Sequence, residues 1–238
     1  MSRVVITQPI INSPFEEPRR HYLFDDQGIT NTVRPGRRPS SYFVPIAKPR
    51  SNKSDGQQTI EDWTGDRIEE NPTVIKIRGA LQRWRRGRYT ADTTRVTARL
   101  LEHWKSSERA RRLFFCQVEA VETIIYATEV ARKSGDQWID NHLLDAATDA
   151  NPGLFRLAMK MATGSGKTAV MAMLIAWHTL NKAANPQDAR FTDSFLVVTP
   201  GITIRDRLRV LLPSDPANYY KGLDIVPVEL RSDLQRAK

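Results

Sequence analysis

Residues 162–168 have the composition and order of a loop that binds phosphate, since they read Ala-Thr-Gly-Ser-Gly-Lys-Thr. Gly164 and Gly166 leave room for backbone N–H groups to approach a phosphate, and a helix that starts here would direct its positive dipole end at the anion. In such a loop the ammonium of Lys167 contacts the β- and γ-phosphates, and the hydroxyl of Thr168 is a ligand of Mg²⁺. The predicted nucleotide-binding residues are Thr163, Gly164, Ser165, Gly166, Lys167 and Thr168, of which Thr168 is also the predicted magnesium ligand.

The loop departs from the general phosphate-loop pattern at one position, because Met161 stands where that pattern has glycine. A chance Gly-Lys-Thr turn is the alternative interpretation. The flanking patterns favour the phosphate loop. An apolar run at residues 154–161 predicts a strand before it, and the sequence from Lys167 to about Lys182 predicts a long helix after it.

The elements around this loop are predicted to form an α/β fold with a parallel sheet. After the long helix, the β-branched run at residues 194–199 predicts a second strand. A helix is expected at residues 203–211 and a third strand at residues 223–228. The alternation of strand, helix and strand is typical of a parallel sheet whose helices form the connections.

The positive charge of the chain is concentrated in front of these elements. Between residues 83 and 112 the basic residues exceed the acidic ones by seven, and three aromatic residues, Trp84, Tyr89 and Trp104, lie among them. This combination suits neutralisation of phosphates and stacking on bases, and a solvated helix face is an equally open alternative. The candidate DNA-binding residues of this segment are Arg83, Arg85, Arg86 and Arg88.

The segments before the loop differ in character. Residues 1 to about 60 contain seven of the fourteen prolines, which predicts extended segments and turns. The spacing of apolar residues then predicts three helices. The first begins near Val74, the second begins near Val96, and the third extends from Phe114 to Thr128. The predicted organisation is an extended proline-rich region at 1–73, a basic helical segment at 74–110 and the α/β part at 111–238.

Composition excludes several other classes of protein. The chain has 238 residues, a formal charge of +9 and 40% apolar residues, which are ordinary values for a soluble globular protein. Its longest purely apolar run, at residues 169–177, is shorter than a membrane span, so we expect no membrane partner and a cytoplasmic location. The single cysteine, Cys116, excludes an internal disulfide and is expected to be a small buried hydrophobe. The four histidines show no metal-ligand spacing, so we expect no metal site made of protein ligands alone.

The loop, preceded by Met161, resembles motif I of superfamily 2 helicases, especially the motor subunits of type III and type I restriction enzymes. The segment Val-Val-Thr-Pro-Gly at residues 197–201 resembles motif Ia of that family. The resemblance implies that Thr199, Gly201 and Arg205 contact a nucleic-acid backbone independently of sequence. An ordinary strand-to-helix turn is the alternative.

The segment Phe-Phe-Cys-Gln-Val-Glu-Ala at residues 114–120 resembles the Q motif of the same helicases. In that motif a glutamine amide recognises the adenine edge with one donor and one acceptor. The resemblance implies this role for Gln117, with Phe114 or Phe115 near the base. The alternative is an exposed helix residue with no such role.

Further segments are similar to the amino-terminal part of restriction endonuclease subunit R proteins of the type III-like group. The resemblance implies the P-loop nucleotide-hydrolase fold, with an incomplete first RecA-like lobe, and ATP and Mg²⁺ as cofactors. It implies sequence-independent contacts to double-stranded DNA, a modification methyltransferase subunit as a further partner, and a nuclease domain further on. The similar segments are residues 12–22, 36–40, 113–123, 160–168, 185–191 and 218–220.

One element of such a motor has no counterpart in these residues. Magnesium binding and water activation need an acidic motif, Asp-Glu-x-His in these helicases, and the chain contains no Asp-Glu pair. We therefore expect no complete catalytic site, and ATP binding with severely impaired hydrolysis. The chain is interpreted as the ATP- and DNA-binding front part of a DNA-dependent ATPase or helicase, truncated before this motif. A non-catalytic nucleotide- or DNA-binding fragment is the alternative, and a small P-loop kinase is a third interpretation.

Overall fold

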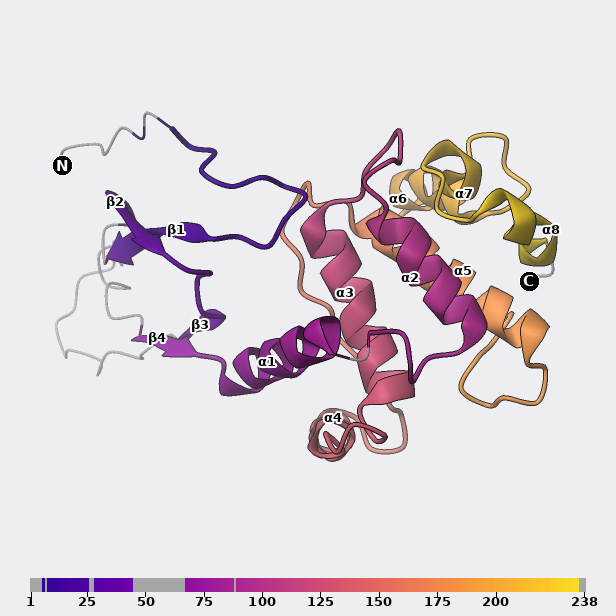
Figure 1. Cartoon of the computed structure of the whole chain (residues 1–238), viewed down its shortest axis with the longest axis horizontal. Helices are drawn as coiled ribbons and strands as arrows, with labels where there is room; N and C mark the ends of the chain where they lie inside the picture. Colours follow the sequence, from indigo (N-terminus) through magenta and orange to yellow (C-terminus); the bar gives the residue numbers. More distant parts are fainter. Residues whose placement is uncertain (1–5, 7, 26–27, 45–66, 88, 236–238) are drawn as a thin grey trace, which may run out of the picture. The chain divides into compact units, whose positions relative to one another are not determined.

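The computed structural model describes residues 6, 8–25, 28–44, 67–87 and 89–235, which belong to two compact units divided after Gly79 (Figure 1). The first unit contains the strands. Among the described residues these pair as two antiparallel two-stranded sheets, β1 with β2 and β3 with β4. The strands are β1 (Arg20–Asp25), β2 (Gly28–Pro35), β3 (Ser41–Val44) and β4 (Arg67–Glu70).

The β1–β2 hairpin is joined to the residues that precede it by side-chain hydrogen bonds. Oδ1 of Asn12 accepts from the backbone N–H groups of Arg19 (2.9 Å) and Arg20 (3.1 Å), and Nδ2 of Asn12 donates to the carbonyl oxygen of Arg20. The hydroxyl of Tyr22 donates to the carbonyl oxygen of Gln8 at 2.5 Å. These bonds satisfy backbone groups that the proline-rich segment cannot pair in a sheet.

Helices dominate the second unit, and the first helix of the chain crosses the boundary after Gly79. The three helices predicted before the loop are confirmed, as is the long helix after it. Helix α4 and the short helices α7 and α8 were not predicted. The buried residues of α4 are Ile139 and Ala147, which form a weak apolar stripe. The helices are α1 (Pro72–Arg86), α2 (Arg95–Lys105), α3 (Phe115–Ile125), α4 (Trp138–Ala150), α5 (Lys167–Ala184), α6 (Ile202–Arg207), α7 (Tyr219–Gly222) and α8 (Arg231–Leu234). A π-turn at Tyr126–Val130 continues α3, and 3-10 turns lie at Leu208–Leu211 and Val228–Leu230.

Helix α5 is the centre of the core. It packs against α2, α3, α7 and α8, and its buried residues lie on several faces, which is expected of a helix surrounded by others. Met173 and Trp177 of α5 are fully buried, and so is Leu101 of α2. Because the predicted phosphate loop leads directly into α5, the most deeply packed helix of this unit holds the loop in place.

The predicted parallel sheet is unconfirmed, and the three strands expected around the loop are not formed in the described structure. Residues 154–161 and 194–199 have no strand pairing, and Leu196 and Val198 are 90% and 82% exposed. Residues 223–228 form a turn that leads into a 3-10 helix, so the prediction of a third strand was wrong. A β-branched run becomes a strand only where a neighbouring strand accepts and donates its backbone hydrogen bonds.

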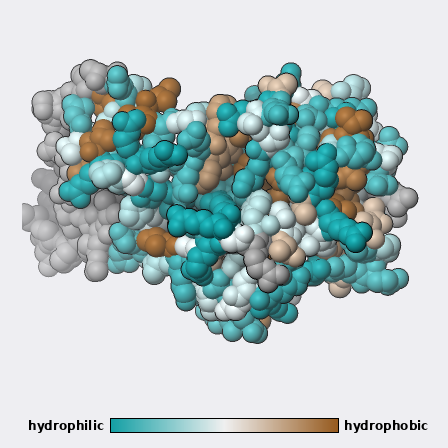
Figure 2. All heavy atoms as spheres, in the orientation of Figure 1, coloured by the Kyte–Doolittle hydropathy of each residue, from teal (hydrophilic) through white to brown (hydrophobic). Residues whose placement is uncertain are grey.

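The molecular face shown in Figure 2 is mostly hydrophilic, with small separate apolar areas. None of the helices in the described part of the chain is long and apolar enough to cross a membrane.

Candidate nucleotide-binding site

The predicted phosphate loop forms a turn at the N-terminus of α5. Gly164 (φ +79°) and Gly166 (φ +81°) both adopt the left-handed conformation that glycine reaches without strain. The hydroxyl of Ser165 donates to the carbonyl oxygen of Ala162 at 2.7 Å and tightens the turn. No side chain caps α5, whose N-cap residue is Gly166. The first N–H groups of the helix and its positive dipole end are thus available to an anion.

The loop has the donors and the open space that a phosphate chain needs. Nζ of Lys167 is exposed and donates to the carbonyl oxygens of Met161 (3.1 Å) and Ala162 (2.9 Å), so the ammonium lies on the loop itself. A methyl group at Gly164 would meet no atom within 4 Å. Thr168, in the first turn of α5, is half-buried. These residues therefore fit a nucleoside triphosphate with its magnesium ion.

The structure brings Gln117 to this loop from a segment 48 residues earlier. Nε2 of Gln117 donates to the carbonyl oxygen of Ser165 at 3.0 Å, and its Oε1 accepts from the backbone N–H of Phe114 at 2.9 Å. The second bond caps the first turn of α3, where Gln117 is 7% exposed. The amide of Gln117 thus stabilises the start of α3 and also contacts the phosphate loop. Such a contact is expected if the Q-motif segment and the loop form one site.

The contact between Gln117 and the loop leaves no space for a side chain at Gly166. A methyl group there would lie 2.1 Å from Nε2 of Gln117. Gly166 is therefore needed for its positive φ and also for close approach, whereas Gly164 is needed for its φ alone.

Cys116 is exposed beside the loop, so the expectation of a buried hydrophobe was wrong. Its Sγ lies 4.0 Å from the carbonyl oxygen of Ser165. The first turn of α3 directs Gln117 inward, and the preceding residue consequently faces outward. Partial desolvation still raises the pKa of the Cys116 thiol above its usual value.

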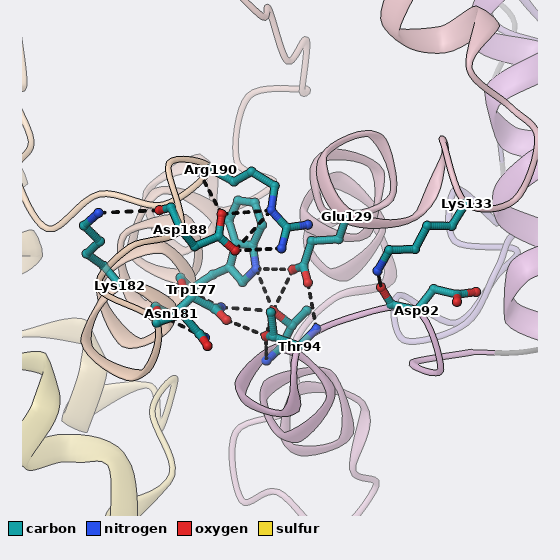
Figure 3. A network of polar contacts seen from close by, with 11 residues as sticks. Asp92, Thr94, Glu129, Lys133, Trp177, Asn181, Lys182, Asp188 and Arg190 are labelled. Carbon is teal, nitrogen blue, oxygen red and sulfur yellow. Dashed lines mark hydrogen bonds and ion pairs between the residues drawn. The ribbon is translucent and has the colours of Figure 1, made fainter.

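A buried polar network fixes α5 to α2 and to the π-turn after α3 (Figure 3). Glu129, which is 3% exposed, accepts hydrogen bonds from the hydroxyl of Thr97 (2.7 Å), Nε1 of Trp177 (2.9 Å) and the backbone N–H of Thr94 (2.8 Å). Asn181 donates to Thr97 at 3.0 Å and accepts from the hydroxyl of Thr94. Three elements thus share one set of satisfied polar groups, an arrangement that rigidifies a core.

Sequence reasoning missed Glu129 because it assumed a continuous α-helical stripe that ends at Thr128. The π-turn inserts one residue into the helix and rotates the residues after it. Glu129 is therefore buried and Thr128 only half-buried. The sequence does contain one indication of a buried polar network. Polar Thr97 and Asn181 stand within otherwise apolar faces of α2 and α5.

The residues predicted for motif Ia lie at the start of α6. The hydroxyl of Thr199 donates to the carbonyl oxygen of Gly201 at 3.2 Å, and Gly201 is the N-cap of α6. Arg205 is 67% exposed and pairs with its neighbour Asp206. Thr199 and Arg205 also line a pocket of about 510 Å³ whose apolar wall includes Phe195.

The basic segment is not one continuous patch. Arg83 is 67% exposed and pairs with Asp136, and Arg86 is exposed, but Arg85 is only 14% exposed and forms ion pairs within the protein. Arg88 lies outside the described residues. Helical periodicity separates neighbouring residues onto different faces, which the linear count of charges did not consider.

The aromatic residues of this segment are not available for stacking on bases. Trp84 is 5% exposed and Trp104 is 2% exposed, because both belong to the apolar stripes of their helices. The ring of Tyr89 lies 4.7 Å from that of Trp84 and its hydroxyl donates to Glu122. Burial therefore argues against base stacking by Trp84 and Trp104, which was one of the two interpretations open for this segment.

The part of the chain that contains this site is similar to a known protein family. A family model described as type III restriction enzyme, res subunit, matches residues 110–221. The match includes Gln117, the phosphate loop and the motif Ia segment, and confirms the family resemblance of these motifs. No curated protein and no solved structure matches the chain.

Proposed function

On the basis of the match of residues 110–221 to the type III restriction enzyme res subunit family model, we propose that this chain binds Mg·ATP and is the nucleotide-binding part of a DNA-dependent motor ATPase. The observation that carries the proposal is the hydrogen bond from Gln117 to Ser165, because it joins the adenine-recognition and phosphate-binding motifs into one site. ATP supplies both a base and a phosphate chain for these two parts.

In this proposal the phosphate chain lies against the N-terminus of α5. Backbone N–H groups of the loop and the helix dipole stabilise the negative charge, and Lys167 exchanges its bonds to Met161 and Ala162 for bonds to phosphate oxygens. The hydroxyl of Thr168 would hold Mg²⁺, which screens the charges of the β- and γ-phosphates. Thr163 and Ser165 are the other residues of the loop that are proposed to contact the nucleotide.

Adenine is assigned to Gln117 because its amide offers a donor and an acceptor side by side. Both are used within the protein, by Ser165 and by the N–H of Phe114. The carbonyl oxygen of the amide has a second lone pair and its NH₂ group a second hydrogen, so adenine can be bound without breaking either bond.

We propose that hydrolysis by these 238 residues alone is slow. Phosphoryl transfer to water needs a group that positions the attacking water and a second protein contribution to the magnesium site. The sequence contains no Asp-Glu pair to supply them. A non-catalytic role in nucleotide or DNA binding follows if this activity is absent.

We further propose sequence-independent contacts to the backbone of double-stranded DNA. Exposed arginines suit this role, which favours Arg83, Arg86 and Arg205 over the enclosed Arg85. Thr199 and Gly201 would add polar contacts at the start of α6. A modification methyltransferase subunit is the protein partner proposed from the family.

The nucleotide assignment is tested by measuring the affinity of the full chain for Mg·ATP by titration calorimetry. Lys167→Ala removes charge-assisted bonds to phosphate and is expected to weaken binding by about tenfold or more. Lys182→Ala is the matched control, because Lys182 lies at the far end of the same helix and its Nζ contacts Asp188. Equal affinities of wild type and Lys167→Ala would refute the site.

A further inference from the structure

Arg85 occupies a position inside the second unit that its place in a basic run does not suggest. Its Nε donates to Oε2 of Glu122 at 2.8 Å, and Nη2 contacts the same oxygen. Nη1 and Nη2 also lie 3.5 and 3.4 Å from Oε1 of Glu119. The side chains of Arg85, Glu119 and Glu122 are 14%, 12% and 2% exposed. Charges so enclosed require partners, and Arg85 supplies a positive charge to both carboxylates.

The two carboxylates and one ring of α3 that Arg85 contacts belong to one stripe of this helix. Phe115, Glu119 and Glu122 are four and then three residues apart, so they lie on the same face of the first two turns. Cζ of Arg85 lies 5.3 Å from the centroid of the Phe115 ring, within the distance of a cation–π contact. The side chain of Arg85 in α1 thus contacts α3 at three successive positions of a single stripe.

Further donors hold the same carboxylate. The hydroxyl of Tyr89 donates to Oε1 of Glu122 at 2.7 Å, and Nζ of Lys105 lies 3.7 Å from that oxygen. Burial, followed by the charge of Glu122, raises the pKa of Tyr89, so its hydroxyl stays protonated as a donor. The carboxylate of Glu122 is therefore held at a fixed place on α3, and Arg85 donates two N–H groups to one of its oxygens.

The contacts of Arg85 with this stripe determine where Gln117 lies. Gln117 belongs to the first turn of α3, between Phe115 and Glu119 in sequence, and projects from the side of the helix opposite this stripe. A rotation of α3 by about 20° would move the end of its side chain by about 2 Å, given the radius of a helix with its side chains. The contact with Ser165 and the tight approach to Gly166 do not tolerate such a displacement.

We propose that Arg85 is a positioning residue for adenine recognition, which acts by fixing the rotation of α3 and hence the place of the Gln117 amide against the phosphate loop. The inference rests on the proposed function, since it requires a nucleotide at that loop. It gives Arg85 a role different from contact with DNA. Its effect is expected mainly on the base, because Lys167 belongs to α5, which also packs against α2, α7 and α8.

The test compares ligands with and without a base on the full chain. Dissociation constants for Mg·ATP, Mg·GTP and magnesium tripolyphosphate are measured for wild type, Arg85→Met and Arg85→Lys. In Arg85→Met the loss of one amide contact is expected to weaken ATP binding about five- to tenfold, with tripolyphosphate binding within about twofold of wild type. Arg85→Lys keeps the charge and is expected to restore part of the ATP preference. Arg132→Met is the matched control, since Arg132 also pairs with a carboxylate, that of Asp140, but is 76% exposed.

A double-mutant cycle shows whether Arg85 acts through Gln117. In a Gln117→Ala background, Arg85→Met is expected to change ATP affinity no further. Additive losses, an unchanged ratio of ATP to GTP affinity in Arg85→Met, or an equal loss of tripolyphosphate binding would each overturn the inference. Glu119→Gln, which preserves shape, repeats the test if Arg85→Met does not fold. If wild type binds none of the three ligands, the proposed function itself fails, and this inference with it.

Discussion

Nε2 of Gln117 donates a hydrogen bond to the carbonyl oxygen of Ser165, 48 residues further along the chain. This bond makes the start of α3 and the phosphate loop into one structural unit. A side chain added on the loop side of this contact is therefore expected to displace the Gln117 amide.

Gly166→Ala is expected to abolish most nucleotide binding, because the new methyl group would lie 2.1 Å from Nε2 of Gln117. Gly164→Ala is the matched control, since it meets the same backbone strain at a positive φ but no neighbouring atom within 4 Å. Titration with Mg·ATP should show a larger loss for Gly166→Ala. Adding Gln117→Ala to Gly166→Ala should recover part of the affinity, and no recovery would contradict the steric explanation.

The Cys116 thiol is expected to report on nucleotide binding. Its pKa is raised by desolvation, so the thiolate fraction at neutral pH is smaller than for a free cysteine. The rate of alkylation by iodoacetamide should therefore rise with pH through a midpoint above the usual value of about 8.5. Saturating Mg·ATP should slow the reaction, whereas Mg²⁺ alone should not. A midpoint below the usual value would contradict the environment described for this thiol.

Thr97→Val is expected to destabilise the fold by about 1–3 kcal/mol, because it leaves buried partners of the Thr97 hydroxyl unsatisfied. These partners are Glu129, Trp177 and Asn181. Thr148→Val is the control, since Thr148 is exposed and its hydroxyl donates to the carbonyl oxygen of Leu144 within α4. Urea unfolding followed by tryptophan fluorescence measures both, and equal stabilities of the two variants would be inconsistent with the network.

Stability is expected to fall in mild acid through His178. Burial lowers the pKa of this imidazole, which packs on Trp177 and Phe191 and whose Nδ1 has no hydrogen-bond partner in the described structure. The unfolded state therefore binds the proton more readily, and the free energy of unfolding decreases as pH falls below about 6.5. His178→Leu should flatten this dependence in urea titrations between pH 5 and pH 7, by about the slope of one proton. The exposed His142→Gln should retain it.

DNA binding is expected to depend on the exposed arginines and on salt. Each phosphate contact contributes about 0.9 to the slope of log affinity against log salt concentration, so Arg83→Ala with Arg86→Ala should reduce that slope by about two. Fluorescence anisotropy with a labelled duplex at several salt concentrations measures it, and Arg132→Ala is the surface control. An unchanged slope would exclude the α1 arginines from the DNA interface.

The sequence by itself determined the phosphate loop, the helix after it and the helices before it. Gly164 and Gly166 are restricted by their own backbone conformation, and the apolar spacing of α2 and α5 is a local property, so both can be recognised without a fold. The association of Gln117 with the loop came from motif resemblance, and the structure supplies the hydrogen bond that explains it.

Only the tertiary structure decided which side chains are enclosed. Arg85 belongs to a run of arginines, yet it is buried because α3 presents Glu119 and Glu122 to it from more than thirty residues away. The π-turn moved Glu129 into the core, and the runs at 154–161 and 194–199 have no strand pairing in the described structure. Burial, ion pairing and sheet formation depend on which distant segment lies opposite, and local composition does not contain that information.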